Sequence, residues 1–188
     1  MKPTIGFALC GSFCTYRKTI DALRGLADEY SIIPIFSEAG YTIDSRFGAA
    51  ESFCSEVETI CEAKALHTIA EVEPFGPKKL LDLLIVAPCT GNTLGKLANG
   101  IADSPVTFAC KAHLRNARPI VLAISTNDGL SASAENIGKL LNRRDYFFVP
   151  FGQDSPVGKP YSLVADMTLL PQTVTAALHR EQIQPLLK

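Results

Sequence analysis

Short apolar segments alternate with amphipathic segments along this chain, and this alternation constrains its fold more than any other feature. The apolar segments lack the polar alternation of half-exposed strands, which predicts strands buried on both faces. They cover residues 4–9, 31–36, 83–87, 120–124 and 146–149. Because helical segments separate them, consecutive strands need crossover connections and run parallel. The sequence therefore predicts a single α/β domain over residues 1–188, with a doubly wound, Rossmann-like or flavodoxin-like parallel sheet covered by helices on both faces.

The helices and loops between these strands follow from apolar periodicity, from Gly and Pro, and from helix caps. Ser104 and Pro105 predict a helix start, because serine suits the cap and proline fits the first turn. Another helix is expected to open at Thr93, where apolar residues recur at helical spacing as far as Ile101. The remaining predictions are a first helix with Ile20, Leu23 and Ala27 on one face, helices over 47–63, 133–141 and 171–182, and loops over 37–45 and 150–160.

Composition excludes several classes of function. The 18 Lys and Arg residues nearly balance 19 Asp and Glu residues, so the formal net charge of −1 does not favour broad contact with a nucleic-acid backbone. Apolar runs stay well short of the roughly 18 residues of a membrane span, and the run after Lys2 is too short for a signal peptide. The six cysteines lack metal-site spacing, which favours buried thiols. We expect a cytoplasmic protein without a metal, a nucleic-acid partner or a membrane segment.

Small hydroxyl, amide and glycine residues follow four of the predicted strands, at the edge where doubly wound sheets bind ligands. They are Gly11-Ser12, Ser37, the segment 88–93 and the segment 125–127. The segment 88–93, Pro-Cys-Thr-Gly-Asn-Thr, combines side-chain donors with a glycine and a helix start, which favours phosphate binding without Lys or Arg. A well-capped helix after a tight turn is the alternative. The sequence has no G-x-G-x-x-G and no P-loop pattern, which disfavours a standard dinucleotide or P-loop site.

Residues 88–103, PCTGNTLGKLANGIAD, resemble the signature of the flavoproteins that include cysteine decarboxylases and flavin prenyltransferases. That signature is a Pro-x-[Ser/Thr]-x-Asn-Thr turn followed by a helix of the Lys-x-Ala-Asn-Gly kind. Four further runs resemble a narrower group within this family, the flavoprotein subunits of enzymes that form a pyridine dicarboxylate. These runs are residues 109–116, 123–130, 148–154 and 162–166, so the resemblance extends through nearly the whole chain.

The resemblance implies bound FMN and a trimer-based homo-oligomer with flavin sites at subunit contacts. Ser12, Ser37 and the turn 90–93 would hold the phosphate, and the isoalloxazine would lie near Gly11, Phe13 and the loop 125–127. The full set of expected cofactor-binding residues is Gly11, Ser12, Phe13, Ser37, Pro88, Cys89, Thr90, Gly91, Asn92, Thr93, Ser125, Thr126 and Asn127. Because Cys10 and Cys89 both end predicted strands, we also expect at least one of these thiols close to the flavin.

The function that the resemblance implies is oxidation of dihydro- or tetrahydro-dipicolinate to pyridine-2,6-dicarboxylate (dipicolinic acid) for spores, together with a second, NAD(P)-binding subunit. Lys111 and Arg115 share a helix face within a segment, 104–127, that has no acidic residue. We expect them to bind the substrate's carboxylates or an acidic partner surface, with a solvated basic face as the alternative. His67 is the expected acid–base residue, partly by analogy with the family.

Two other functions stay open from the sequence. The first is flavin-dependent decarboxylation of a cysteinyl or aromatic acid, for which the family places a histidine shortly before the third strand. Here the insert around 74–77 lengthens the distance from His67 to Pro88, and the turn 124–127 keeps only the Asn of the decarboxylases' Pro-x-Met-Asn. The second is a non-catalytic subunit that binds flavin and acts only with a partner.

Overall fold

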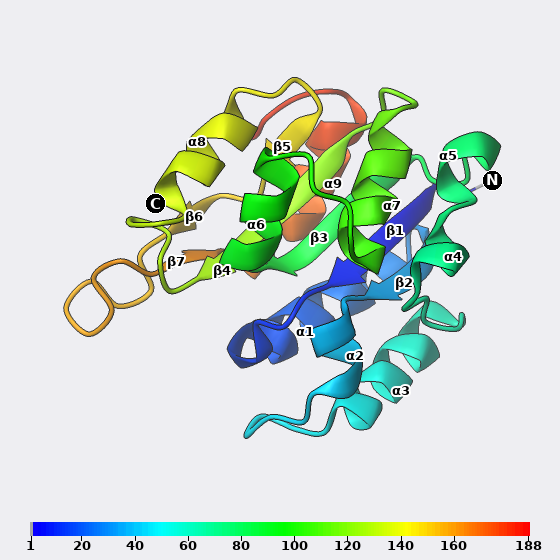
Figure 1. The fold of residues 1–188 in the computed structure, drawn as a ribbon, viewed down its shortest axis with the longest axis horizontal. Coiled ribbons are helices and arrows are strands. Elements are labelled where there is room, and N and C mark those ends of the chain that lie inside the picture. The colour runs from blue at the N-terminus through cyan, green and yellow to red at the C-terminus, as the bar shows by residue number, and fades with distance from the viewer. Residues whose placement is uncertain (1) are drawn as a thin grey trace.

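A seven-stranded sheet runs through the middle of the computed structural model, which describes residues 2–188 (Figure 1). The strands are β1 (Thr4–Leu9), β2 (Ser31–Phe36), β3 (Leu83–Cys89), β4 (Ile120–Thr126), β5 (Tyr146–Phe148), β6 (Phe151–Gly152) and β7 (Leu163–Ala165). The α-helices are α1 (Tyr16–Ala27), α2 (Glu38–Thr42), α3 (Ala50–Cys61), α4 (Ile69–Val72), α5 (Phe75–Lys78), α6 (Gly91–Ala98), α7 (Pro105–Leu114), α8 (Ala134–Leu141) and α9 (Leu170–Leu178). Two 3-10 turns, η1 (Phe13–Thr15) and η2 (Met167–Leu169), precede α1 and α9.

The parallel part of the sheet has the order β2-β1-β3-β4-β5, which is the flavodoxin-like order. The predicted fold class is therefore confirmed, and β1 and β2 have the predicted bounds. β3 is buried along its whole length, as its unbroken apolar sequence indicates. The chain leaves β1 toward β2 and leaves β3 toward β4, so the strand order reverses between β1 and β3. Such a reversal opens a crevice at the carboxyl ends of the two strands.

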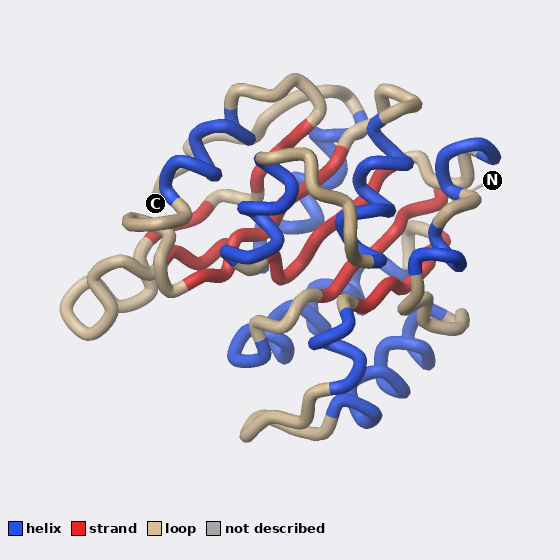
Figure 2. The backbone as a smooth tube through the Cα atoms, viewed as in Figure 1, coloured by secondary structure: helices blue, strands red, loops and turns tan. Residues whose placement is uncertain are grey.

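Helices cover both faces of the sheet (Figure 2). α1 and α9 pack on one face, while α6, α7 and α8 pack on the other with the short α4 and α5 beside them. α2 and α3 lie at the β2 edge. Within residues 2–188, each helix is too short or too polar to cross a bilayer.

Several predicted connections contain short elements that periodicity does not reveal. The expected loop 37–45 holds α2, which the Ser37 side chain caps by accepting a hydrogen bond from Gly40 N (3.1 Å). The expected helix 47–63 is shorter at both ends and stops where Glu62 takes a left-handed backbone conformation (φ 50°). α4 and α5 occupy the stretch before β3. Helices of four or five residues have too few apolar positions to show a period.

One edge of the otherwise parallel sheet is antiparallel, which the sequence did not indicate. β6 and β7 form an antiparallel hairpin around the expected loop 150–160, and β7 also pairs antiparallel with the end of β4. β5 occupies the first half of that edge of β4 and β7 the second, with Ser125 opposite Val164. β6 and β7 are too short to show an alternation of apolar and polar residues, and neither lies in an apolar run as long as the run 146–149 that predicts β5.

The buried His113 ties α7 to the start of β4. Its Nε2 lies 3.1 Å from the carbonyl oxygen of Pro119. Burial lowers the pKa of His113 to about 4, whereas an exposed histidine titrates near 6.5. Between these two values the unfolded chain binds a proton that the folded protein excludes, so folding stability decreases as the pH falls through this range.

We expect the free energy of unfolding to decrease by up to roughly 3 kcal/mol between pH 6.5 and pH 4. His113→Gln removes the titrating ring, so urea titrations of this variant should lose most of that slope above about pH 4.5, where carboxyl groups still contribute little. His179→Gln changes an exposed histidine and should keep the slope. An unchanged slope in His113→Gln would contradict the assignment.

Candidate functional site

A cavity of about 360 Å³ opens at the carboxyl ends of β1, β3 and β4. Its walls come from five segments: the loop after β1, the start of α1, the turn after β3, the end of β4 and the β6–β7 hairpin. The lining residues are Gly11, Ser12, Cys14, Thr15, Lys18, Thr90, Ser125, Thr126, Asn127, Asp154, Lys159, Ser162 and Val164. The cavity lies at the reversal of strand order between β1 and β3.

The loop after β1 leads directly into a helix start. Thr15 N donates to Ser12 O (3.1 Å), so the N–H groups of Phe13 and Cys14 precede the first hydrogen bond of η1. The hydroxyls of Ser12 and Ser125 lie 2.7 Å apart, which joins the end of β1 to the end of β4 across β3. Ser12 and Ser125 therefore form a small hydroxyl surface on one wall of the cavity.

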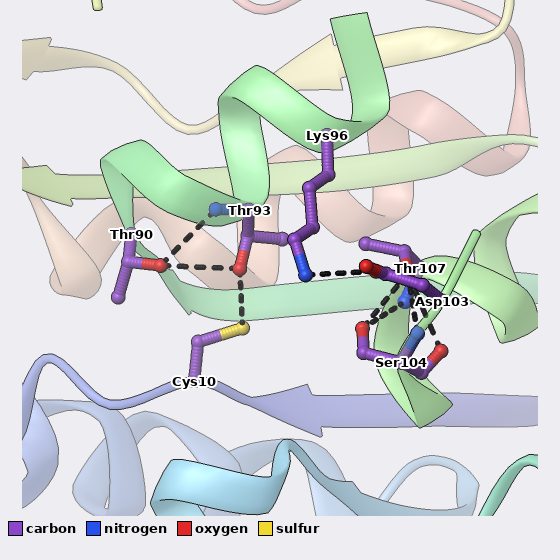
Figure 3. A network of polar contacts seen from close by, with 7 residues as sticks. All are labelled: Cys10, Thr90, Thr93, Lys96, Asp103, Ser104 and Thr107. Carbon is purple, nitrogen blue, oxygen red and sulfur yellow. Dashed lines mark hydrogen bonds and ion pairs between the residues drawn. The ribbon is translucent and has the colours of Figure 1, made fainter. Parts of the chain in front are cut away.

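The turn after β3 is the first turn of α6. Thr90 caps the helix: its Oγ1 accepts from Thr93 N (3.3 Å) and lies 3.1 Å from Thr93 Oγ1 (Figure 3). The Thr93 hydroxyl in turn donates to the Cys10 sulfur (3.3 Å), which ties the turn to β1. The helix starts at Gly91 rather than at Thr93, so the N–H groups of Gly91 and Asn92 precede its first internal hydrogen bond, from Leu94 N to Thr90 O (2.9 Å).

Gly91 stands where no side chain fits. A β-carbon there would lie 2.7 Å from Ser133 Oγ and Thr126 Oγ1, and 2.8 Å from Asp128 Oδ1. Asp128 Oδ1 accepts hydrogen bonds from the hydroxyls of Thr126 and Ser133. The missing side chain lets the first turn of α6 pack directly on the loop after β4. The N-terminus of α6 is thereby held beside the cavity that Thr90 lines.

The electrostatics of the cavity favour an anion. Two helical segments begin at this edge of the sheet: α6, and η1 continued by α1. The N-terminus of a helix carries partial positive charge and free N–H groups. The charged lining residues are Lys18, Lys159 and Asp154, which leaves one excess positive charge. Lys159 pairs with Asp154 at 3.0 Å, and a hydrogen bond from the buried Ser162 helps lower the pKa of that carboxyl group. Lys18 has no acidic partner within 4.0 Å among residues 2–188.

The structure brings most of the sequence-predicted cofactor residues together. Six of them line the cavity: Gly11, Ser12, Thr90, Ser125, Thr126 and Asn127. The turn behind Thr90 consists of three more, Gly91, Asn92 and Thr93. Phe13 packs beside Gly11, and Ser37 follows β2 with its N–H bonded to Leu9 O (2.9 Å). Pro88 and Cys89 are buried in β3 and do not line the cavity.

Neither of the two cysteines singled out from the sequence lines the cavity. Cys10 and Cys89 are buried beneath it, and burial raises the pKa of the Cys10 thiol to about 11. A thiol with such a pKa stays protonated and unreactive at neutral pH. The cysteine on the cavity wall is the exposed Cys14, which no sequence pattern distinguished.

The predicted substrate and acid–base residues lie elsewhere. Lys111 and Arg115 are at the end of α7, which leads into the amino end of β4, whereas the cavity lies at the carboxyl end. A crossover helix runs antiparallel to the strands it joins, so its C-terminus reaches the opposite edge of the sheet. His67 stacks on Tyr41 with ring centroids 3.9 Å apart, and its Nδ1 lies 3.7 Å from Glu71 Oε2. None of these three predicted residues lines the cavity.

Sequence reasoning missed the charged residues that do line it. Lys18 lies on α1 shortly after the Gly-Ser end of β1, which is a usable signal because the first turn of a helix after a strand end faces the ligand crevice. Asp154, Lys159 and Ser162 reach the cavity only through the β6–β7 hairpin. No sequence signal predicted that hairpin, so its residues could not be assigned to the site.

A larger cavity of about 690 Å³ adjoins the first and shares Lys18, Asp154 and Val164 with it. It lies between α1 and the segment from β6 to the start of α9. Its walls also carry Asp21, Asp166 and Lys188, so three carboxylates face two ammonium groups. Since its net charge is negative and α6 does not reach it, this cavity is the poorer place for an anion.

Comparison with known proteins agrees with this geometry. A family model described as Flavoprotein matches residues 1–173. The chain is 44% identical over 184 residues to the B subunit of dipicolinate synthase from Bacillus subtilis (strain 168), covering 97% of this chain and 92% of that protein. The crystal structure of the corresponding B subunit from Bacillus halodurans superposes with a TM-score of 0.91, at 40% identity over 100% of this chain and 98% of the other.

A more distant structure shares the fold. The FMN-dependent cysteine decarboxylase SpaF superposes with a TM-score of 0.69 at 18% identity, over 95% of this chain and 97% of its own. Such low identity shows a common architecture and carries no function across. The family match over residues 1–173, together with 44% identity across almost the entire chain, shows that this chain belongs to the flavoprotein family.

Proposed function

We propose that the chain binds FMN in the 360 Å³ cavity, with the phosphate at the junction of β1 and β3. The observation that carries this proposal is the pair of helix N-termini at that junction, with Gly91 leaving no room for a side chain between α6 and β4. Membership of the flavoprotein family supports a flavin, and structural neighbours that are named as FMN-dependent or FMN-binding support FMN in particular.

The residues at the junction fit a phosphate group. The N–H groups of Gly91 and Asn92 and the Ser12 hydroxyl are donors of the kind that phosphate oxygens accept. The Thr90 hydroxyl donates to Thr93 Oγ1 in this structure and would turn toward a bound phosphate. The nearby Asp128 carboxylate is directed to the hydroxyls of Thr126 and Ser133. Ser125, Thr126 and Asn127 would then hold the polar edge of the flavin ring.

We further propose that the chain is the flavoprotein subunit of a dipicolinate synthase, because relatives of that name match nearly its full length. It would help to oxidise dihydro- or tetrahydro-dipicolinate to pyridine-2,6-dicarboxylate, together with a second, NAD(P)-binding subunit of that enzyme. FMN in such an enzyme supplies an acceptor for two electrons. The chain's own residues would bind the diacid, orient it and exclude water. We also propose a cytoplasmic, trimer-based homo-oligomer, as the family resemblance implies.

Lys18 and Lys159 are better placed than Lys111 and Arg115 to attract the two carboxylates of such a substrate. Both lysines line the cavity, whereas Lys111 and Arg115 lie at the opposite edge of the sheet. An ammonium group binds a carboxylate through charge-assisted hydrogen bonds, which are stronger than neutral ones. Decarboxylation is less favoured, because His67 lies against Tyr41 and the decarboxylase relatives share only the fold.

The purified, untagged protein is expected to show the visible absorption of an oxidised flavin, or to acquire it when FMN is added, at about one flavin per chain. Denaturation and chromatography of the released chromophore identify it. A colourless protein that does not bind added FMN would contradict the proposal.

Gly91→Ala is expected to weaken FMN binding by at least about tenfold, because the added methyl group forces α6 away from the loop after β4. It should also lower the free energy of unfolding by roughly 1–3 kcal/mol. Gly138→Ala in α8 is the matched control: its β-carbon meets nothing within 4 Å, so it should add up to about 1 kcal/mol and leave FMN affinity unchanged. Equal FMN affinities in the two variants would contradict the role of Gly91.

Lys18→Met is expected to weaken binding of pyridine-2,6-dicarboxylate to the FMN-loaded protein by about tenfold, because it removes a cation from the cavity. Lys111→Met removes the same charge at the far edge of the sheet and should change this affinity less than about twofold. Isothermal titration calorimetry measures both. The reverse order of effects would place the diacid on α7.

A further inference from the structure

The hydroxyl of Tyr16 is buried near the ends of β1 and β2 without a hydrogen-bond partner. Tyr16 is the first residue of α1 and is 0% exposed. Within residues 2–188, its hydroxyl is one of two buried side-chain polar atoms that make no hydrogen bond. Such a hydroxyl has lost its bonds to water without replacement, and a phenylalanine would fill the same space without this loss. Packing alone therefore does not explain a tyrosine here.

Two aromatic neighbours hold the ring in place. Its centroid lies 5.4 Å from that of Phe13 and 5.0 Å from that of Phe53, the second pair edge to face. Phe13 is also the residue that packs beside Gly11 at the end of β1. Because both neighbours restrain the ring, the hydroxyl stays close to the ends of β1 and β2.

The Tyr16 hydroxyl and Ser37 Oγ both border the space beside Gly40. A β-carbon added to Gly40 would be 2.7 Å from the Tyr16 hydroxyl, 3.2 Å from Leu9 O and 3.3 Å from Ser37 Oγ. The three oxygens thus surround one small volume that exists because residue 40 is glycine. Leu9 O already accepts from Ser37 N (2.9 Å), and Ser37 Oγ already accepts from Gly40 N (3.1 Å). Each of these oxygens keeps one lone pair for a further donor.

We infer that Tyr16 is a positioning residue that acts through Ser37 on the phosphate of the bound flavin. The structure shows no hydrogen bond between the two side chains, so a small shift on FMN binding would bring the Tyr16 hydroxyl within bonding distance of Ser37 Oγ. With that bond formed, both lone pairs of Ser37 Oγ are occupied and the Ser37 hydrogen is left to donate outward. Two incoming hydrogen bonds also polarise the Ser37 hydroxyl, which makes it a stronger donor to an anion. The buried hydroxyl thereby acquires the partner that it lacks. This inference rests on the proposed binding of FMN at the junction of β1 and β3.

The test compares FMN with riboflavin, which has the same ring and ribityl chain but no phosphate. Tyr16→Phe is expected to weaken FMN binding by about tenfold, the usual effect of losing one well-placed hydrogen bond, and to change riboflavin binding less than about twofold. Tyr30→Phe changes a buried tyrosine at the other end of α1 and should leave both affinities unchanged. In a Ser37→Ala background, adding Tyr16→Phe should cost no further FMN affinity, because the two residues act in series.

The thermal unfolding midpoint of ligand-free Tyr16→Phe should equal or exceed that of the wild type, because the variant loses only an unpaired hydroxyl. Equal weakening of FMN and riboflavin binding, or full additivity with Ser37→Ala, would overturn the inference and leave Tyr16 a packing residue. Wild-type FMN affinity in Tyr16→Phe overturns this inference alone. A wild-type chain that does not bind FMN overturns the proposed function and this inference together.

Discussion

The close approach of α6 to the loop after β4, which the absent side chain of Gly91 permits, is the constraint on which the site depends. Three oxygens, from Thr126, Asp128 and Ser133, lie where its β-carbon would be. With α6 held there, its N-terminus meets the start of η1 and α1 at the reversal of strand order between β1 and β3. Two helix N-termini then begin at this edge of the sheet, beside a cavity that the hydroxyls of Ser12, Thr90 and Ser125 line.

β4 connects the proposed anion site to the rest of the cavity. Its first half pairs with β5 and extends the parallel sheet, while its end pairs with β7 and brings a hairpin over the cavity. That hairpin supplies Asp154, Lys159 and the buried Ser162, so one strand positions both the hydroxyl wall and a charged wall. The buried central strands provide a rigid support, and the variable chemistry lies in the segments at their ends.

The parallel core and the ends of its strands were predictable because their signals are local. Unbroken apolar runs located β1 to β5, and Gly, Ser, Thr and Asn at the strand ends located Ser12, Thr90 and Ser125. The β6–β7 hairpin was not predictable, since its strands lack an apolar run as long as that of β5 and the pairing of β7 with β4 is a tertiary property. The expectation that Lys111 and Arg115 bind a substrate or an acidic partner rests on their charge and their shared helix face, and neither property says which edge of the sheet a helix end reaches. The start of α6 at Gly91 also followed tertiary packing, which helical periodicity from Thr93 could not show.

A crystal structure of the chain in complex with FMN tests the central claim most directly. The account predicts the phosphate oxygens within hydrogen-bonding distance of the Thr90 hydroxyl and of the N–H groups that begin α6, with Ser12 and Ser37 on the opposite side. A phosphate in the larger cavity between α1 and α9, away from Gly91 and Thr90, would contradict it. The paired helix starts would then be a structural feature of the flavoprotein fold rather than its anion site.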